Sequence, residues 1–105
     1  MGCLQPHAAM AAHNLVAADL RGIDSHGVAR LSGYYRLFKA GRLKGNSDYT
    51  FTRSFGAISI LNANQGLGLV AGEIAMKQAI ASAEQYGAGA VSVINSNHFG
   101  IAGRY

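Results

Sequence analysis

The chain changes from apolar to polar within residues 90–100, AVSVINSNHFG. The run from Ala90 to Ile94 predicts a short strand, and its lack of polar alternation indicates burial on both faces. The asparagine-rich loop that follows carries His98. Because ligands of α/β proteins commonly lie outside the carboxyl ends of strands, this loop is a candidate for a functional site.

The segments that precede this strand predict a helix, a loop and further strands. Apolar spacing predicts the helix over residues 69–86, ended by Gly87. Residues 62–68 are rich in Asn and Gly and predict a turn-rich loop. Aromatic and branched residues predict short strands around residues 49–51 and 57–61.

Two helices are predicted in residues 1–45, the N-terminal helical segment. The first is the Ala-rich run from Ala8 to Leu20. The second begins near Ser25, a good N-cap residue, and ends at Gly41. Its apolar stripe comprises Val28, Leu31, Tyr35 and Phe38. The order of elements indicates a mixed α/β fold, in which residues 46–105 form an incomplete α/β segment.

Composition indicates a globular chain of one domain at most. The 105 residues are 50% hydrophobic and 13% charged, so apolar burial can offset the entropy lost on folding. The net charge of +4 arises partly from a basic cluster, Arg36, Lys39, Arg42 and Lys44. We interpret this cluster as a solvated helix end rather than a nucleic-acid surface, because no RNA-binding aromatic strand or metal-finger spacing accompanies it.

The sequence predicts neither a membrane span nor a metal site. No apolar run reaches the roughly 20 residues that cross a bilayer, and the N-terminus lacks the pattern of a signal peptide. No His-x-x-x-His or Cys-x-x-Cys spacing occurs. The single cysteine, Cys3, excludes an internal disulfide and favours a reducing compartment, so we expect a cytoplasmic protein.

Three polar residues of the second predicted helix are spaced by four. His26, Arg30 and Tyr34 therefore share one face, beside Ser25 at the helix start. Arginine holds a carboxylate through two charge-assisted hydrogen bonds, and His and Tyr can exchange a proton with the neighbouring oxygen. This face suits a small hydroxy or keto acid, although an exposed polar face without a ligand explains the same spacing.

The turn Gly66-Leu67-Gly68 resembles the start of a dinucleotide fingerprint, in which bare backbone lets a pyrophosphate approach a helix. The match fails because the third glycine, Gly72, comes one residue late. In addition, Asn95 stands where an acid should bind the ribose. The sequence therefore favours a structural turn.

His98 has two interpretations. A neutral imidazole is suited to accept a hydroxyl proton while hydride leaves the same carbon, with Asn95, Ser96 and Asn97 orienting the ring. Alternatively, His98 is a loop histidine whose ring is satisfied by its Asn neighbours. The residues alone leave both interpretations open.

Two motifs resemble the malate/L-lactate dehydrogenase family. They are ADLRGIDSHGVARL, residues 18–31, which is followed by Tyr34, and NSNHFGIAG, residues 95–103. The resemblance to the family continues in NQGLG, residues 64–68, and in Ala75-Met76. The resemblance covers nearly the whole chain.

The resemblance implies an oxidoreductase that transfers a hydride between a small 2-hydroxy acid, of malate or lactate type, and NAD or NADP. It implies that Arg30 clamps the substrate carboxylate and that Ser25, His26 and Tyr34 contact the substrate. His98 would be the proton acceptor, with His26 as the other candidate.

The resemblance further implies a fold unlike the usual Rossmann fold, and a homodimer with active sites near the interface. The chain would be an N-terminal fragment, because most of the cofactor-binding portion of such enzymes would follow Tyr105. The alternative is a truncated, non-catalytic α/β module that acts only in dimerisation or binding.

Overall fold

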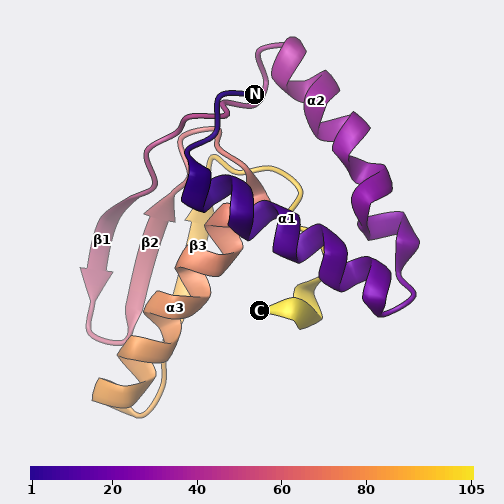
Figure 1. Ribbon diagram of the computed structural model, residues 1–105. Coiled ribbons are helices and arrows are strands. Elements are labelled where there is room, and N and C mark those ends of the chain that lie inside the picture. The colour runs from indigo at the N-terminus through magenta and orange to yellow at the C-terminus, as the bar shows by residue number, and fades with distance from the viewer.

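The computed structural model describes all residues, 1–105. The α-helices are α1 (Gln5–Leu20), α2 (Leu31–Lys39) and α3 (Gly68–Tyr86), and the strands are β1 (Thr50–Phe55), β2 (Ile58–Asn62) and β3 (Ala90–Ile94) (Figure 1). Short 3₁₀ turns span Asp24–His26, Val28–Arg30 and Ala102–Arg104. This order confirms the mixed α/β fold that the sequence predicts.

The three strands form one sheet in the order β1-β2-β3. β1 and β2 are antiparallel, whereas β2 and β3 are parallel and are connected through α3. The parallel register sets Asn62 beside Ile94. The loops that leave these two strand ends, residues 63–67 and 95–101, therefore start side by side and bring their polar residues together.

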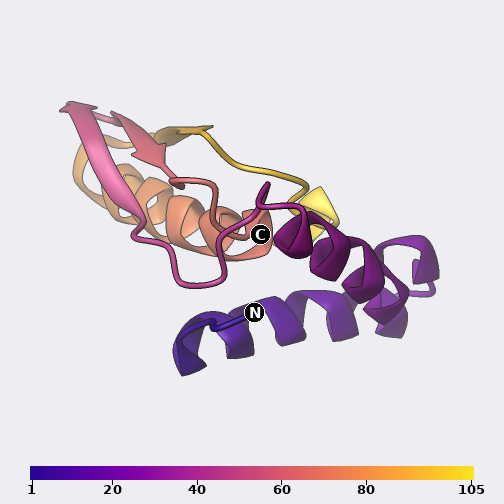
Figure 2. The ribbon, with the colours of Figure 1, turned by 90° about the horizontal axis from the view of Figure 1, so that it is seen from above.

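Helix α3 covers one face of the sheet and α1 lies beyond it, so the sheet, α3 and α1 form successive layers (Figure 2). Leu61 of β2 and Ala71 of α3 share a buried cluster. The opposite face of the sheet has no cover, and Ile94 is exposed there. The expectation that Ala90–Ile94 is buried on both faces is wrong: exposed and half-buried residues alternate along β3 because only one face meets a helix.

A second buried cluster lies where α1, α2 and the start of α3 meet. Its members are Leu15, Tyr34, Leu43, Leu67, Leu69 and Val70. Burial of each leucine stabilises the fold by about 1.5–3 kcal/mol relative to exposure. Asn14 adds a polar link, since its Nδ2 donates to the Leu69 carbonyl at 3.4 Å. This cluster holds Tyr34 rigidly at the edge of the site described below.

The helix predicted from Ser25 to Gly41 is interrupted at Gly27. There ψ is −151°, and the regular α-helix begins only at Leu31. The carboxylate of Asp19 accounts for the break. It accepts a hydrogen bond from the N–H of Val28 at 3.0 Å and occupies the space that a side chain at Gly27 would need.

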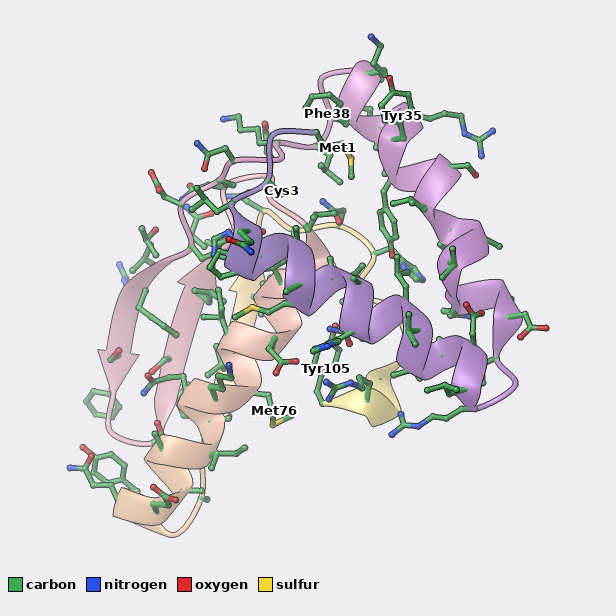
Figure 3. The ribbon with its side chains drawn as sticks, in the orientation of Figure 1. Met1, Cys3, Tyr35, Phe38, Met76 and Tyr105 are labelled. Atoms are coloured by element: carbon green, nitrogen blue, oxygen red, sulfur yellow. The ribbon has the colours of Figure 1, made fainter.

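The break is followed by an apolar stripe of which three of the four predicted residues face outward. Val28, Leu31 and Tyr35 are 50%, 46% and 52% exposed, whereas Tyr34 is 3% exposed. Tyr35 and Phe38 lie together toward the far end of α2 (Figure 3), with ring centroids 6.4 Å apart. The stripe prediction is therefore wrong for Val28, Leu31 and Tyr35 and right only for Phe38, because α2 packs on the core through Tyr34, with Leu37 and Phe38 beside it.

Candidate active site

His98 lies in the loop after β3, where its ring meets a side chain from α2. Tyr34 Oη is 2.8 Å from His98 Nδ1, and the backbone N–H of Gly100 donates to the same nitrogen at 3.2 Å. No hydrogen bond joins the ring to the asparagines beside it, so the interpretation of His98 as a loop histidine satisfied by its Asn neighbours is wrong. The side chain is exposed on its outer side, where a substrate can reach it.

The hydrogen bond from Gly100 selects one tautomer of the neutral ring. Because an N–H points at Nδ1, this nitrogen is an acceptor, and the proton of neutral His98 sits on Nε2. The hydroxyl of Tyr34 then donates to Nδ1 as well. Nδ1 is therefore the atom through which neutral His98 can take a proton, and Tyr34 Oη is its immediate neighbour.

The surroundings favour an uncharged pair. Desolvation of the inner edge of the ring, the positive charge of Arg30 and then that of His26 lower the pKa of His98 below its usual 6.5. Burial raises the pKa of Tyr34 above 10, and Arg30 opposes this rise. At neutral pH the pair is a neutral imidazole and an intact phenol, which are the forms that a proton acceptor and a hydroxyl donor need.

His26 approaches His98 from the 3₁₀ turn Asp24–His26. The two ring centroids are 5.2 Å apart, with an angle of 34° between the planes. Ser25 Oγ lies 2.9 Å from His26 Nδ1. The structure thus brings both predicted histidines together even though the helix expected to carry His26 is broken.

Arg30 ends the next turn, Val28–Arg30. Its Nε donates to the backbone carbonyl of Ser25 at 2.8 Å, which leaves the two terminal nitrogens of the guanidinium for a ligand. The ion pairs of the structure involve Glu73 with Lys77 and Arg104, so no carboxylate of the chain neutralises Arg30. Its free edge can donate two parallel hydrogen bonds to a carboxylate.

An open cavity of about 290 Å³ joins these groups. It is lined by Arg30, Gly33, Tyr34, Arg36, Leu37 and His98. Two guanidiniums border it and no acidic residue does, so the cavity suits an anion. Ser25 and His26 do not line the cavity; Ser25 contacts both His26 and Arg30 from outside it.

Sequence reasoning missed Arg36 as a site residue and assigned it to the basic cluster at the helix end. A signal was available, because Arg30, Gly33, Tyr34 and Leu37 recur at steps of three and four. Arg36 lies three residues after Gly33 and borders the same cavity. The glycine at position 33 leaves the helix surface bare between the two arginines.

A larger hollow, about 850 Å³, lies elsewhere, along α3 and β3. Its walls are mainly small apolar side chains of these two elements, together with Asn95, Ser96, Asn97, Phe99 and Tyr105. No histidine, arginine or acidic residue lines this hollow, whereas Arg30, Arg36 and His98 line the smaller cavity. The smaller cavity beside His98 is the candidate active site.

The glycine turn of residues 66–68 is filled by the chain itself. The N–H of Gly68, at the start of α3, donates to Asn97 Oδ1 at 2.9 Å. The backbone carbonyls of Asn97 and His98 cover the place that a side chain at Gly68 would take. The turn therefore does not fit the pyrophosphate of a dinucleotide, which agrees with its interpretation as a structural turn.

The fold contains neither a cluster of metal ligands nor a membrane-spanning helix. No three His, Cys, Asp or Glu side chains gather closely enough to hold a metal ion. No helix has the length and apolar character needed to cross a membrane. Cys3 is a free, half-buried thiol.

Comparison with known proteins gives consistent matches. The malate/L-lactate dehydrogenase family matches residues 1–105. Malate dehydrogenase of Pyrococcus abyssi is 42% identical over 105 residues, which are 100% of this chain and 29% of that enzyme.

Solved structures agree in fold. Malate dehydrogenase from Entamoeba histolytica has a TM-score of 0.93 at 42% identity, over 99% of this chain and 29% of that chain. Sulfolactate dehydrogenase from Methanocaldococcus jannaschii has a TM-score of 0.96 at 38% identity, over 99% of this chain and 30% of that chain. The chain thus spans less than a third of the length of these relatives. Since the match extends along all 105 residues, the chain belongs to the malate/L-lactate dehydrogenase family.

Proposed function

We propose that these 105 residues supply the proton-transfer and carboxylate-binding groups of an enzyme that oxidises a small 2-hydroxy acid, or reduces the matching 2-keto acid, with NAD or NADP. The observation that carries the proposal is the cavity in which Arg30, Tyr34 and His98 meet. It combines an anion-binding guanidinium with a hydrogen-bonded proton acceptor, which are the two functions that a hydroxy acid requires.

The substrate carboxylate binds the two terminal nitrogens of Arg30. Because Nε of Arg30 is fixed on the Ser25 carbonyl, the guanidinium presents one defined edge to the cavity. A charge-assisted pair of hydrogen bonds of this kind both orients the substrate and contributes about 1.5–3 kcal/mol per bond. Ser25 therefore acts in substrate binding by holding Arg30.

The substrate hydroxyl donates to Tyr34 Oη. During oxidation its proton moves to Tyr34 Oη, and the proton of Tyr34 moves to His98 Nδ1, 2.8 Å away. Tyr34 ends as it began, His98 becomes an imidazolium, and the substrate becomes a keto acid. We assign proton acceptance to His98 rather than His26, because His98 lines the cavity and His26 does not.

Two arginines at the cavity favour a substrate with two anionic groups. Arg30 takes the carboxylate next to the hydroxyl, and Arg36 is placed for a second carboxylate or a sulfonate. The cavity volume of about 290 Å³ is sufficient for a four-carbon acid and lies at the small end of ligand pockets. We propose that a malate-type acid is preferred over lactate.

NAD or NADP would accept the hydride of the substrate carbon. The glycine turn of residues 66–68 has no room for its phosphates, so we propose that the cofactor is held mainly by parts of the enzyme beyond these 105 residues. The lone cysteine, Cys3, is consistent with a reducing compartment, and we propose the cytoplasm.

A homodimer is proposed from an apolar groove beside α1. The groove has a volume of about 330 Å³ and is lined only by apolar residues, among them Val16, Val28 and Leu31. These three side chains are each about half exposed. A second copy that covers the groove would remove this apolar surface from water. Exposed apolar patches commonly mark such interaction sites.

The test is a chimera in which residues 1–105 replace the matching part of the Entamoeba histolytica enzyme, whose fold they share at a TM-score of 0.93. We expect oxidation of malate and reduction of oxaloacetate, measured by the absorbance of the reduced nicotinamide. His98→Gln should lower kcat/KM by at least about 10²-fold, the usual effect of losing a general base. His13→Gln, on an exposed position of α1, is the control and should change nothing. A folded chimera that turns over no hydroxy or keto acid would contradict the proposal.

A further inference from the structure

We propose that Asn97 is the positioning residue for His98, acting by clamping the His98 loop to the glycine turn of residues 66–68. The inference rests on the proposed function, because it assigns to the glycine turn a role in placing the proton acceptor. Asn97 lines the larger hollow along α3 and β3, but it neither lines the cavity beside Arg30 nor contacts the ring of His98, so its effect on His98 would be transmitted through the backbone.

Both ends of the Asn97 amide are engaged by the glycine turn. Oδ1 accepts the N–H of Gly68 at 2.9 Å, and Nδ2 donates to the carbonyl of Gly66 at 2.7 Å. The N–H of Gly68 is one of the groups at the start of α3 without a partner inside the helix, so Asn97 also caps this helix from a distant loop. The two bonds fix both the distance and the rotation of the loop relative to α3.

The glycine at position 68 permits this close approach. A side chain there would meet the carbonyl groups of Asn97 and His98. The backbone next to His98 therefore lies directly on the first turn of α3, and residue 68 has to be glycine for it to do so. The glycine turn of residues 66–68, which resembles a dinucleotide fingerprint, thus contacts the loop of His98 where a phosphate would lie in a dinucleotide-binding protein.

Asn97 is the last side-chain anchor before the histidine. Asn95 holds the base of the loop, since its carbonyl accepts the N–H of Gln65 at 2.8 Å and its Nδ2 donates to Asn62 at 3.1 Å. Ser96 is exposed and makes only a 3.5 Å contact. After Asn97, the imidazole itself is hydrogen-bonded only by Tyr34 and Gly100, and the ring of His26 lies beside it. Loss of the Asn97 clamp should therefore let His98 move away from Tyr34.

Displacement of a reacting group by about 1 Å can cost about 10²-fold in rate. We therefore expect Asn97→Ala, made in the chimera described above, to lower kcat by about 10- to 100-fold. KM should change less than about threefold, because Arg30 lies on a different element and keeps its contact with Ser25. Asn97→Asp retains the acceptor for Gly68 and should recover part of the lost kcat. Ser96→Ala, the matched variant in the same loop, should behave as the unmodified chimera.

A second readout separates positioning from general destabilisation and does not depend on activity. In protein labelled with ¹⁵N-histidine, Asn97→Ala should shift the His98 Nδ1 resonance toward that of a nitrogen without a hydrogen bond, whereas Ser96→Ala should leave it in place. Gly68→Ala, which displaces the same loop from the other side, should cause the same shift. An unchanged Nδ1 resonance in Asn97→Ala would overturn the inference, whether or not the chimera is active. An inactive chimera in which the Nδ1 resonance still shifts would overturn the proposed function alone.

Discussion

Tyr34 Oη and His98 Nδ1 are 2.8 Å apart although 64 residues separate them in the chain. Tyr34 is fixed by the buried cluster between α1, α2 and α3, whereas His98 is exposed at the end of a loop. The hydrogen bond therefore ties the exposed His98 side chain to a buried residue of the core. The ring of Tyr34 packs in the core, and its hydroxyl reaches the edge of the cavity. The role of the hydroxyl in the site can therefore be tested separately, without removing the ring from the core.

Tyr34→Phe tests this separation. The phenyl ring keeps its place in the core, and loss of one hydrogen bond should lower the free energy of unfolding by about 0.5–1.5 kcal/mol. In the chimera, kcat should fall by about 10²-fold or more, because the proton path to His98 Nδ1 loses its hydroxyl. Thermal unfolding and steady-state kinetics measure the two effects. Tyr35→Phe, on an exposed tyrosine, is the control; equal kinetics for the two variants would remove Tyr34 from the path.

The lowered pKa of His98 predicts the acid limb of the pH profile. The neutral ring is the proton acceptor, so kcat/KM for oxidation should stay high down to a pH below 6.5 and fall only as pH drops through the folded-state pKa. Arg30 is one cause of the lowering, so Arg30→Gln should move the His98 pKa upward in an NMR titration. A His98 pKa at or above 6.5 in the unmodified protein contradicts this prediction.

The lowered pKa of His98 also makes the stability of the fold depend on pH. Between the folded-state pKa and 6.5 the unfolded chain binds more protons at His98 than the folded chain does. The free energy of unfolding is therefore unaffected by the titration of His98 above about pH 6.5. It falls as the pH drops from 6.5 through the folded-state pKa of His98. His98→Gln should remove this part of the pH dependence from urea unfolding curves measured at several pH values. An unchanged pH dependence would show that His98 titrates alike in both states.

Local sequence patterns were sufficient to predict those elements whose contacts are made by residues nearby in the chain. The spacing of apolar residues located α3, and Gly87, with φ of +82°, ends it as predicted. Asn64 and Gln65 have positive φ, as expected for the turn-rich loop of residues 62–68. The parallel pairing of β2 and β3 follows from the helix between them, and it explains why the two Asn-rich loops meet.

The errors arose where a contact from another element overrides a local pattern. The four-residue spacing predicted a continuous helix from Ser25, but nothing in residues 25–41 reveals that the carboxylate of Asp19 binds the N–H of Val28. The proximity of His26 to His98 was likewise invisible to spacing, because it depends on how the turns pack against the loop after β3. The resemblance of the motifs predicted both histidines as site residues, but it carried no information on their geometry.

Arg30→Gln should weaken the binding of every 2-hydroxy acid. The carboxylate next to the hydroxyl is common to malate and lactate, so KM for both should rise by at least about 10- to 100-fold, the equivalent of about 1.5–3 kcal/mol for one of the two hydrogen bonds. Steady-state kinetics of the chimera with both acids provide the measurement. Arg21→Gln is the control, because Arg21 lies outside the cavity, where it donates to the carbonyl of Gly103. An unchanged KM would exclude Arg30 as the carboxylate clamp.

Arg36→Gln should discriminate between substrates. If Arg36 binds a second anionic group, KM for malate should rise by about 10-fold or more, whereas KM for lactate should change less than about twofold. Lys39→Gln removes a cation from the same helix end outside the cavity, and it controls for general attraction of anions. A parallel rise of both KM values in Arg36→Gln would indicate that the second arginine acts on the shared carboxylate.

Leu31→Glu tests the apolar groove beside α1 as a dimer contact. Leu31 is 46% exposed and lines the groove with Val16 and Val28, so a charge there places a carboxylate in the proposed interface. Burial of one leucine is worth about 1.5–3 kcal/mol, and its loss should raise the dimer dissociation constant by about 10- to 100-fold. Sedimentation velocity of the chimera over a range of concentrations measures this constant. Ile80→Glu places the same charge on an exposed apolar residue of α3 outside the groove and should leave the dimer intact. A Leu31→Glu chimera that keeps the mass and dissociation constant of the unmodified protein would show that the groove is not the contact between copies.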